Sequence, residues 1–313
     1  MAAPDIETHG AERRLGETPD ADAALEIDSI MIGRWPANTS WRAPLSRTVH
    51  IWLCLALGVA ACHPRVDGHA AYSSQPADSA QTSYLAPPRV TSAVRMDGGG
   101  VALAGRTDPE ARVRLQSFDG AAYGVTAGAD GTWTLVTPPG QGVRLLGVSE
   151  VVASRAVQSM GYLAVLPGSG QAAILLRAGG GSQTLAAPAS APWISAIDFD
   201  AGGGAVICGL GRPGSPVRVV VDGVVAGEAR PDADGRFSVA PTFALKPGDH
   251  QADVQSATGE GHASFFVSAS PPLSTPPFVG QRQATGWRID WLTPGGAPQT
   301  TLAFDPPEGG RRP

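Results

Sequence analysis

The sequence has 313 residues, enough for two domains of ordinary size, and 42% of them are hydrophobic, enough to build buried cores. Its 40 glycines and 28 prolines disfavour long helices, because both residue types destabilise a helix interior. The formal net charge of -5 leaves no basic footprint and argues against nucleic acid as the main partner.

The first predicted element is a secretory signal that ends at Ala61. Residues 51–61 form an uninterrupted apolar run. As a helix this run would be about 17 Å long at roughly 1.5 Å per residue, whereas a bilayer core is about 30 Å thick. Arg42 and Arg47 supply the positive charge that precedes such signals. The run is therefore interpreted as a cleaved signal, and a short core helix with an incidental cysteine is the alternative.

The end of this run carries a family resemblance. Val59-Ala60-Ala61-Cys62 resembles the lipobox of bacterial lipoproteins. The resemblance implies that a signal peptidase recognises Val59, Ala60 and Ala61, and that Cys62 becomes a lipid-modified N-terminus. Two or more acyl chains anchor stably, since each buried methylene contributes about 0.8 kcal/mol. The lipid bilayer is thus an expected partner, and the covalent lipid on Cys62 is the only prosthetic group expected.

Residues 1–61 are predicted to comprise an N-terminal extension and the signal peptide. Signals usually begin almost at the first residue, and Met31 would give a conventional start. We therefore expect residues 1–30 to be absent from the cellular protein. His63 stands where an aspartate retains some lipoproteins in the inner membrane, so its presence favours the outer membrane and periplasm.

Residues 62–88 are predicted to be the lipidated cysteine and a flexible, disordered tether. From Pro64 onward the segment is rich in Ser, Ala, Pro and Gln and poor in large apolar residues. Coil scaling gives it a root-mean-square reach of roughly 25 to 30 Å. Beyond the tether only Cys208 remains, so the folded part has no pair of cysteines for an internal disulfide.

An internal repeat follows, in which one ungapped offset of about a hundred residues superimposes two segments. The matching pairs are Gly98-Gly99-Gly100 with Gly202-Gly203-Gly204, Gly105 with Gly209, Pro109 with Pro213, Val113-Arg114 with Val217-Arg218, Ala129-Asp130-Gly131 with Ala233-Asp234-Gly235, and Trp133 with Phe237. Two copies of one supersecondary unit are implied.

Each copy has the pattern of antiparallel strands. Residues 217–221 are mostly valine and lead into an Asp222-Gly223 turn, and apolar Phe237 and Val239 alternate with polar residues. The pattern resembles bacterial Ig-like domains, which implies a small disulfide-free antiparallel sandwich. The expected fold is all-β, with two tandem Ig-like sandwiches. Arg114 and Arg218, at equivalent positions, are expected to face solvent.

A second, shorter similarity enlarges the repeat. Gly179-Gly180 is followed by Gln183-Thr184, and Gly295-Gly296 is followed by Gln299-Thr300 at the same spacing. Both lie between apolar segments, as in a hairpin, so each sandwich is expected to be followed by one. The predicted domains are repeat 1 with its hairpin at 89–190, repeat 2 at 191–269, and a Pro-rich linker, C-terminal hairpin and tail at 270–313.

Several motifs that suggest chemistry are interpreted as structural. The Asp-x-Asp-Gly sequence at 232–235 lacks the later glutamate of an EF-hand loop, so a turn between strands is preferred to a calcium site. The Gly-x-Gly-x-x-Gly sequence at 209–214 leads into prolines and valines rather than the helix that dinucleotide binding requires. His250 and His262 lack zinc-ligand spacing and are assigned to exposed loops or strands, so no metal site is predicted.

The sequence Trp-Arg-Ile-Asp-Trp at 287–291 is the strongest candidate for a binding face. Period-two alternation places Trp287, Ile289 and Trp291 on one face of a strand. That face is expected to pack on the second sandwich, and an exposed strip that stacks on a sugar or a partner protein is the alternative. No catalytic residues are assigned. The predicted function is a non-enzymatic envelope lipoprotein that acts as a structural or interaction module, and the alternative is an envelope protein that binds or hydrolyses peptidoglycan or polysaccharide.

Overall fold

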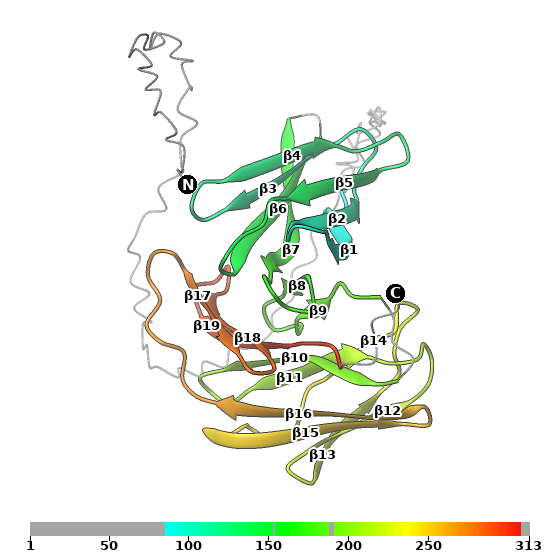
Figure 1. Ribbon diagram of the computed structural model, residues 1–313, viewed down its shortest axis with the longest axis vertical. Helices are drawn as coiled ribbons and strands as arrows, with labels where there is room; N and C mark the ends of the chain where they lie inside the picture. The colour runs from blue at the N-terminus through cyan, green and yellow to red at the C-terminus, as the bar shows by residue number, and fades with distance from the viewer. Residues whose placement is uncertain (1–84, 153, 188–190, 308–313) are drawn as a thin grey trace, which may run out of the picture. The chain divides into compact units, whose positions relative to one another are not determined.

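A computed structural model describes residues 85–152, 154–187 and 191–307, all of which fall within one compact unit. Every regular element in this part of the chain is a β-strand, and the strands form four antiparallel sheets (Figure 1). The part of the chain that the structure describes has no helix long and apolar enough to cross a membrane. The all-β expectation is therefore confirmed for these residues.

The first sandwich packs a three-stranded sheet on a larger one. The smaller sheet, in spatial order, contains β1 (Arg89–Arg95), β2 (Val101–Arg106) and β5 (Thr132–Thr137). The facing sheet begins β4 (Ala122–Thr126), β3 (Arg112–Ser117), β6 (Arg144–Val152) and β7 (Arg155–Val165). In β3 and β5 every second side chain is buried, as expected when one face of a strand meets a core. Val101, Leu103, Leu115 and Trp133 are among the buried side chains between the two sheets.

The second sandwich repeats this arrangement. One sheet contains β14 (Arg236–Val239), β11 (Ala205–Leu210) and β10 (Trp193–Asp200). The other contains β13 (Val224–Ala229), β12 (Val217–Val221), β15 (Gly248–Ser256) and β16 (Gly259–Val267). The strand order in both sandwiches is the same, strand for strand. Ile197, Phe199, Val219, Val254 and Phe265 belong to the core between these sheets.

The internal repeat is preserved in the details of pairing. The bounds of β2 and β11 differ by the same 104 residues at both ends, and so do those of β6 and β15. The pairing of β1 with β2 has a bulge between Val90 and Ser92, and that of β10 with β11 has one between Ile194 and Ala196, at the same offset. A conserved bulge sets the same local bend in each copy. The two sandwiches are thus copies of one backbone design.

Both predicted hairpins are present, and their registers match. The first hairpin joins β8 (Ala173–Leu176) to β9 (Gln183–Thr184), and Ile174 pairs with Thr184. The second joins β18 (Gly286–Leu292) to β19 (Pro298–Phe304), and Asp290 pairs with Thr300. A further strand, β17 (Phe278–Gln283), lies on the other edge of β18. The glycine and Gln-Thr similarity therefore marks two hairpins of equal register.

The two hairpins join different sheets of their sandwiches. The first continues the four-stranded sheet, because β8 pairs with β7. The second continues the three-stranded sheet, because β19 pairs with β10. Residues 270–313 were expected to be a linker, hairpin and tail, and their strands extend the sheet that β10 and β11 form. That sheet becomes six-stranded, with the order β14, β11, β10, β19, β18, β17.

A third apolar core holds the two sandwiches together. It fills the space between the six-stranded sheet of the second sandwich and strands β6, β7 and β8 of the first (Figure 1). Its buried side chains are Leu145, Ala164, Leu166, Ile174, Leu176, Ala196, Cys208, Trp287, Ile289, Trp291 and Ala303. The six-stranded sheet is consequently covered on both faces, and β10 and β18 are buried along almost their whole length.

Candidate functional site

The predicted aromatic face lies in the interior. Trp287, Ile289 and Trp291 are 7%, 0% and 0% exposed and belong to the third core. The alternation along the strand is as predicted, and the expectation that this face packs rather than binds a ligand agrees with the burial. The exposed strip considered as the alternative is wrong, because strands β6 to β8 of the first sandwich cover the three side chains. This face was expected to pack on the second sandwich. It packs instead against strands of the first sandwich as well, in the core that the two sandwiches share.

The opposite face of β18 is buried as well. Arg288 and Asp290 are 6% and 0% exposed and form a two-bond ion pair, with N···O distances of 2.9 Å and 2.8 Å. Thr300 donates a 2.6 Å hydrogen bond to Asp290, and Arg288 also donates to the Ser268 hydroxyl at 2.9 Å. Alternating charge on a strand normally indicates a solvated face. Here the charges neutralise each other inside the sheet packing, where removing one partner alone is costly.

The motifs interpreted as structural have the expected roles. Asp232 accepts hydrogen bonds from the backbone N–H groups of Asp234 and Arg236, at 2.9 Å and 2.8 Å, and so closes the turn before β14. The glycines at 209–214 run from β11 into a loop and then β12, without a helix. Within the described residues no group of three or more His, Cys, Asp and Glu side chains is placed to hold a metal ion.

The two histidines lie on neighbouring strands and bind separate aspartates. His262, on β16, is exposed and contacts Asp253 at 2.6 Å. His250, on β15, is only partly exposed, because it bonds Asp222 at 2.6 Å and the backbone carbonyl of Lys246 at 2.7 Å. The expectation of exposed strand residues therefore fits His262 better than His250. Arg114 and Arg218 both face solvent, as predicted.

A buried carboxyl group lies in the third core. Asp198, on β10, is 2% exposed and accepts hydrogen bonds from the backbone N–H and hydroxyl of Ser182, at 2.5 Å and 2.6 Å. The Thr301 hydroxyl donates to the same carboxyl group, and the Trp291 indole N–H donates to Thr301 at 3.1 Å. Burial raises the pKa of Asp198 in spite of these donors. This network connects the first hairpin, β10 and the second hairpin.

A second buried acid has fewer partners. Glu150, on β6, is 0% exposed and occupies the position that Val254 has in the second repeat. Its Oε2 accepts a 3.3 Å hydrogen bond from the Asp108 backbone N–H, and its Oε1 has no partner among the described residues. Burial raises the pKa of Glu150. The carboxyl group of Glu150 therefore binds its proton more tightly in the folded protein than in the unfolded chain.

Replacing Glu150 with glutamine is expected to stabilise the protein at neutral pH. Because the folded pKa of Glu150 is raised, the stability of the native protein falls as the pH rises from the ordinary glutamate value through the folded pKa. The neutral amide of Glu150→Gln has no such dependence and should gain about 1 kcal/mol at pH 7. Urea unfolding at several pH values between 4 and 7 measures the gain. Glu228→Gln is the control, because Glu228 is exposed and its replacement should change the free energy of unfolding little. A stability gain of Glu150→Gln that did not shrink toward pH 4 would contradict the burial explanation.

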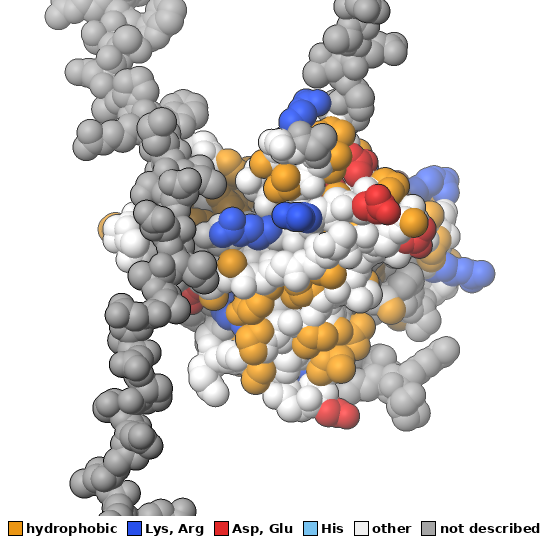
Figure 2. Space-filling view, turned by 90° about the horizontal axis from the view of Figure 1, so that it is seen from above, with side chains coloured by type: hydrophobic (Ala, Val, Ile, Leu, Met, Phe, Trp, Pro, Cys, Tyr) orange, Lys and Arg blue, Asp and Glu red, His pale blue; other side chains and the backbone are white. Residues whose placement is uncertain are grey.

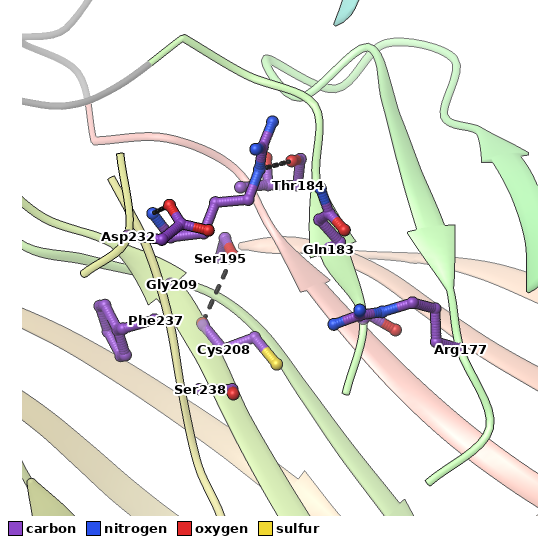
Figure 3. A pocket seen from close by; sticks show the side chains of 11 residues that line it. Arg177, Gln183, Thr184, Ser195, Cys208, Gly209, Asp232, Phe237 and Ser238 are labelled. Carbon is purple, nitrogen blue, oxygen red and sulfur yellow. Dashed lines mark hydrogen bonds between the residues drawn. The ribbon is translucent and has the colours of Figure 1, made fainter. Parts of the chain in front are cut away.

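The described residues also enclose a small polar pocket between the first hairpin and the second sandwich. It has a volume of about 130 Å³ (Figure 3). Arg177 enters it from the side of the first hairpin, and Asp232 and Phe237 lie on the opposite side. Ser195, Cys208 and Ser238 line its second-sandwich wall. Burial raises the pKa of the Cys208 thiol, so this side chain stays neutral and is a weak nucleophile.

A larger groove adjoins this pocket. It has a volume of about 440 Å³ and shares Arg177, Gln183 and Arg236 with the pocket. Neither space was predicted, because their walls come from strands far apart in the sequence. On the face shown in Figure 2, charged side chains of both signs are scattered among polar and hydrophobic ones. That face has no basic stripe of the kind that follows a nucleic-acid backbone.

The predicted N-terminal extension and signal peptide at 1–61 and most of the predicted tether at 62–88 lie outside the described residues. So do the lipid-modified Cys62, the signal peptidase recognition residues Val59, Ala60 and Ala61, and the candidate start Met31. These assignments remain predictions.

No protein-family model matches the chain, and no curated protein matches it. Solved structures that resemble it include the BSP domain of a biofilm-associated protein, with 13% identity, 60% of this chain and 30% of that chain covered, and a TM-score of 0.22. The central fibronectin-III array of RIM-binding protein has 12% identity, with 70% of this chain and 89% of that chain covered and a TM-score of 0.23. The tandem Ig domains A164-A165 of titin have 11% identity, with 58% of this chain and 96% of that chain covered and a TM-score of 0.18.

The strand order of each sandwich decides the fold. Three strands face four in both copies, and the chain crosses between the two sheets in a Greek-key manner. The described chain consists of two tandem Ig-like sandwiches. The predicted fold class is confirmed, including the hairpin that follows each sandwich.

Proposed function

We propose that this protein is a non-enzymatic lipoprotein of the bacterial cell envelope that displays its two Ig-like sandwiches as a structural or interaction module. The observation that carries the proposal is the order of parts along the chain. A lipobox-like sequence ends at Cys62, a polar segment follows, and the folded unit begins with β1 at Arg89. This is the layout of an anchor, a spacer and a displayed domain. His63 favours the outer membrane and periplasm as its location.

The acidic side chains of the described residues support a non-enzymatic role. Hydrolysis of a glycan commonly uses two carboxyl groups that flank the scissile bond. Glu150 and Asp198 are buried, on β6 of the first sandwich and β10 of the second. Asp234, which lines the groove, forms an ion pair with Arg236, and Asp232, which lines the adjoining pocket, closes a turn. Both carboxyl groups thus have structural partners.

Cys62→Ser is expected to release the protein from membranes and leave the sandwiches folded. Serine lacks the thiol that forms the thioether to the lipid, so the variant should lose a metabolic fatty-acid label and move to the soluble fraction. Membrane fractionation, label autoradiography and far-UV circular dichroism measure these effects. Cys54→Ser is the matched control, because Cys54 lies inside the apolar run of the signal and should leave the label unchanged. A Cys62→Ser protein that kept its label in the membrane fraction would rule out the lipid anchor.

Binding of envelope glycans is the second candidate function, and the groove between the sandwiches is the observation that favours it. Clefts between domains are common ligand sites, and this one is large enough for a small molecule. The soluble Cys62→Ser protein can be tested for sedimentation with purified peptidoglycan. Retention above that of an unrelated acidic protein would favour this candidate, and absence of retention would leave the display role.

A further inference from the structure

The groove between the sandwiches brings together three arginines from distant parts of the chain. Arg89 is the first residue of β1, Arg177 directly follows β8, and Arg236 is the first residue of β14. The first hairpin places Arg177 beside the second sandwich, so the cluster exists only when both sandwiches are docked. The volume of the groove, about 440 Å³, lies in the range of small-molecule sites.

Backbone carbonyl groups hold two of these guanidinium groups in place. Arg177 donates through Nε to the Gly181 carbonyl at 2.9 Å and through Nη2 to the Gly180 carbonyl at 3.0 Å. Arg236 donates through Nε to the Thr184 carbonyl at 3.1 Å. Figure 3 shows the Arg177 side chain extended into the space beside Gln183. Side chains fixed in this way lose little conformational entropy when a ligand binds.

Each fixed guanidinium group retains donors that these bonds do not use. In the described residues the Nη1 of Arg177 and the Nη2 of Arg236 make no hydrogen bond, and neither does the Arg89 side chain. The Nη1 of Arg236 bonds Asp234, which neutralises one positive charge. Asp232 lines the adjoining pocket rather than the groove, and its Oδ1 is occupied by two backbone N–H groups. The groove lining carries three arginines against the one aspartate, Asp234, and this excess of positive charge suits an anionic ligand.

The remaining walls of the groove suit an organic body attached to that group. Val90 and Leu175 give buried apolar surface, and Met160 is 75% exposed beside them. Gln183 and Ser159 add neutral hydrogen-bonding groups. A carboxylate has two acceptor oxygens, so it can accept one hydrogen bond from the free Nη1 of Arg177 and one from the free Nη2 of Arg236.

We propose that this groove binds a small organic ligand that bears one carboxylate, with an acidic sugar as the simplest representative. Arg177 and Arg236 hold the carboxylate, and Arg89 adds positive charge at the open side. The proposal does not depend on the lipid anchor, because the groove lies wholly within the described sandwiches. If the Cys62→Ser protein stayed in the membrane fraction, the titration would use detergent-solubilised protein, so failure of one proposal leaves the other testable.

The test uses the soluble Cys62→Ser protein and ligand-observed NMR titration at physiological salt. D-glucuronate and D-glucose are a matched pair, since they differ in the carboxylate, and inorganic phosphate is the third probe. Glucuronate is expected to bind weakly in absolute terms, but with a Kd at least tenfold lower than that of glucose. Equal affinities for the two sugars, or absence of glucuronate binding, would overturn the proposal. Phosphate binding as tight as glucuronate binding would overturn the assignment to a carboxylate.

Arginine variants locate the bound ligand. Arg177→Gln is expected to raise the Kd for glucuronate about tenfold, because it removes the positive charge and the free Nη1 donor. Arg218→Gln is the control, since Arg218 is exposed on the other sheet of the second sandwich and should leave the Kd unchanged. Thermal unfolding of each variant checks that the sandwiches remain docked. If Arg89→Gln, on the exposed rim, and Arg177→Gln both left the Kd unchanged, the groove would not be the site.

Discussion

Replacing Trp291 with alanine is expected to lower the free energy of unfolding by about 3–5 kcal/mol. Trp291 is 0% exposed in the core between the two sandwiches, and its ring packs edge-on against Tyr162, with 6.0 Å between ring centroids. Its indole N–H also donates to Thr301, which in turn bonds Asp198. Truncation therefore leaves a cavity and removes a donor from the buried network. Urea unfolding followed by far-UV circular dichroism measures the loss.

The matched control for this substitution is Phe266→Ala. Phe266 lies on β16 and is 52% exposed, so removing its ring should cost about 1 kcal/mol or less. Equal losses for Trp291→Ala and Phe266→Ala would mean that the core between the sandwiches contributes little to stability. Because that core joins the two sandwiches, we also expect the wild-type protein to unfold in one transition rather than two.

Replacing Gly209 with alanine is expected to destabilise the protein by about 3 kcal/mol, the upper end of the usual cost of overpacking. Gly209 pairs with Phe237 across β11 and β14, and the phenyl ring lies where a Cβ atom would be. The same Cβ atom would overlap the Trp193 carbonyl oxygen, which belongs to the backbone and cannot rotate away. Gly105 meets Trp133 and the Arg89 carbonyl in the same way, so the first repeat has an equivalent site.

Gly124→Ala is the matched control for this prediction. Gly124 also lies within a strand, β4, but a Cβ atom there would meet only the Val113 carbonyl oxygen, at an ordinary 3.7 Å. Thermal unfolding should therefore show a small change for Gly124→Ala and a large decrease in Tm for Gly209→Ala. A Gly209→Ala protein as stable as the wild type would show that the ring-over-glycine contact is not required for the fold.

The sequence predicts the local structure well because its signals are local. The alternation of apolar and polar side chains predicts where the strands lie. The single ungapped offset between the two copies requires turns of equal length, so the matching glycines and Asp-Gly turns predict two similar sandwiches. Gly105 and Gly209 recur with Trp133 and Phe237 because a ring needs an adjacent residue without a side chain. The equal spacing of Gln183-Thr184 and Gln299-Thr300 likewise predicts two hairpins of equal register.

The long-range contacts could not be predicted in the same way. Nothing in residues 286–304 indicates that β19 pairs with β10, about a hundred residues earlier in the chain. Sequence alternation describes one strand and leaves open what covers each face, so the burial of Arg288 and Asp290 was missed. The arginine groove was missed for the same reason, because Arg89, Arg177 and Arg236 come together only through packing of the two sandwiches.

The two hairpins join different sheets, so the repeated segment of the sequence is not the same as the unit that folds. In the described chain β1 pairs only with β2, whereas its counterpart β10 is flanked by both β11 and β19. The second sandwich needs the first to cover Ile289 and Trp291, and the first hairpin needs the second sandwich to bury Ser182. An exchange of whole repeats between related genes would therefore break the shared core, even though each exchanged segment kept all its own strands. Such a pair can diverge by substitution but resists lengthening by further copies.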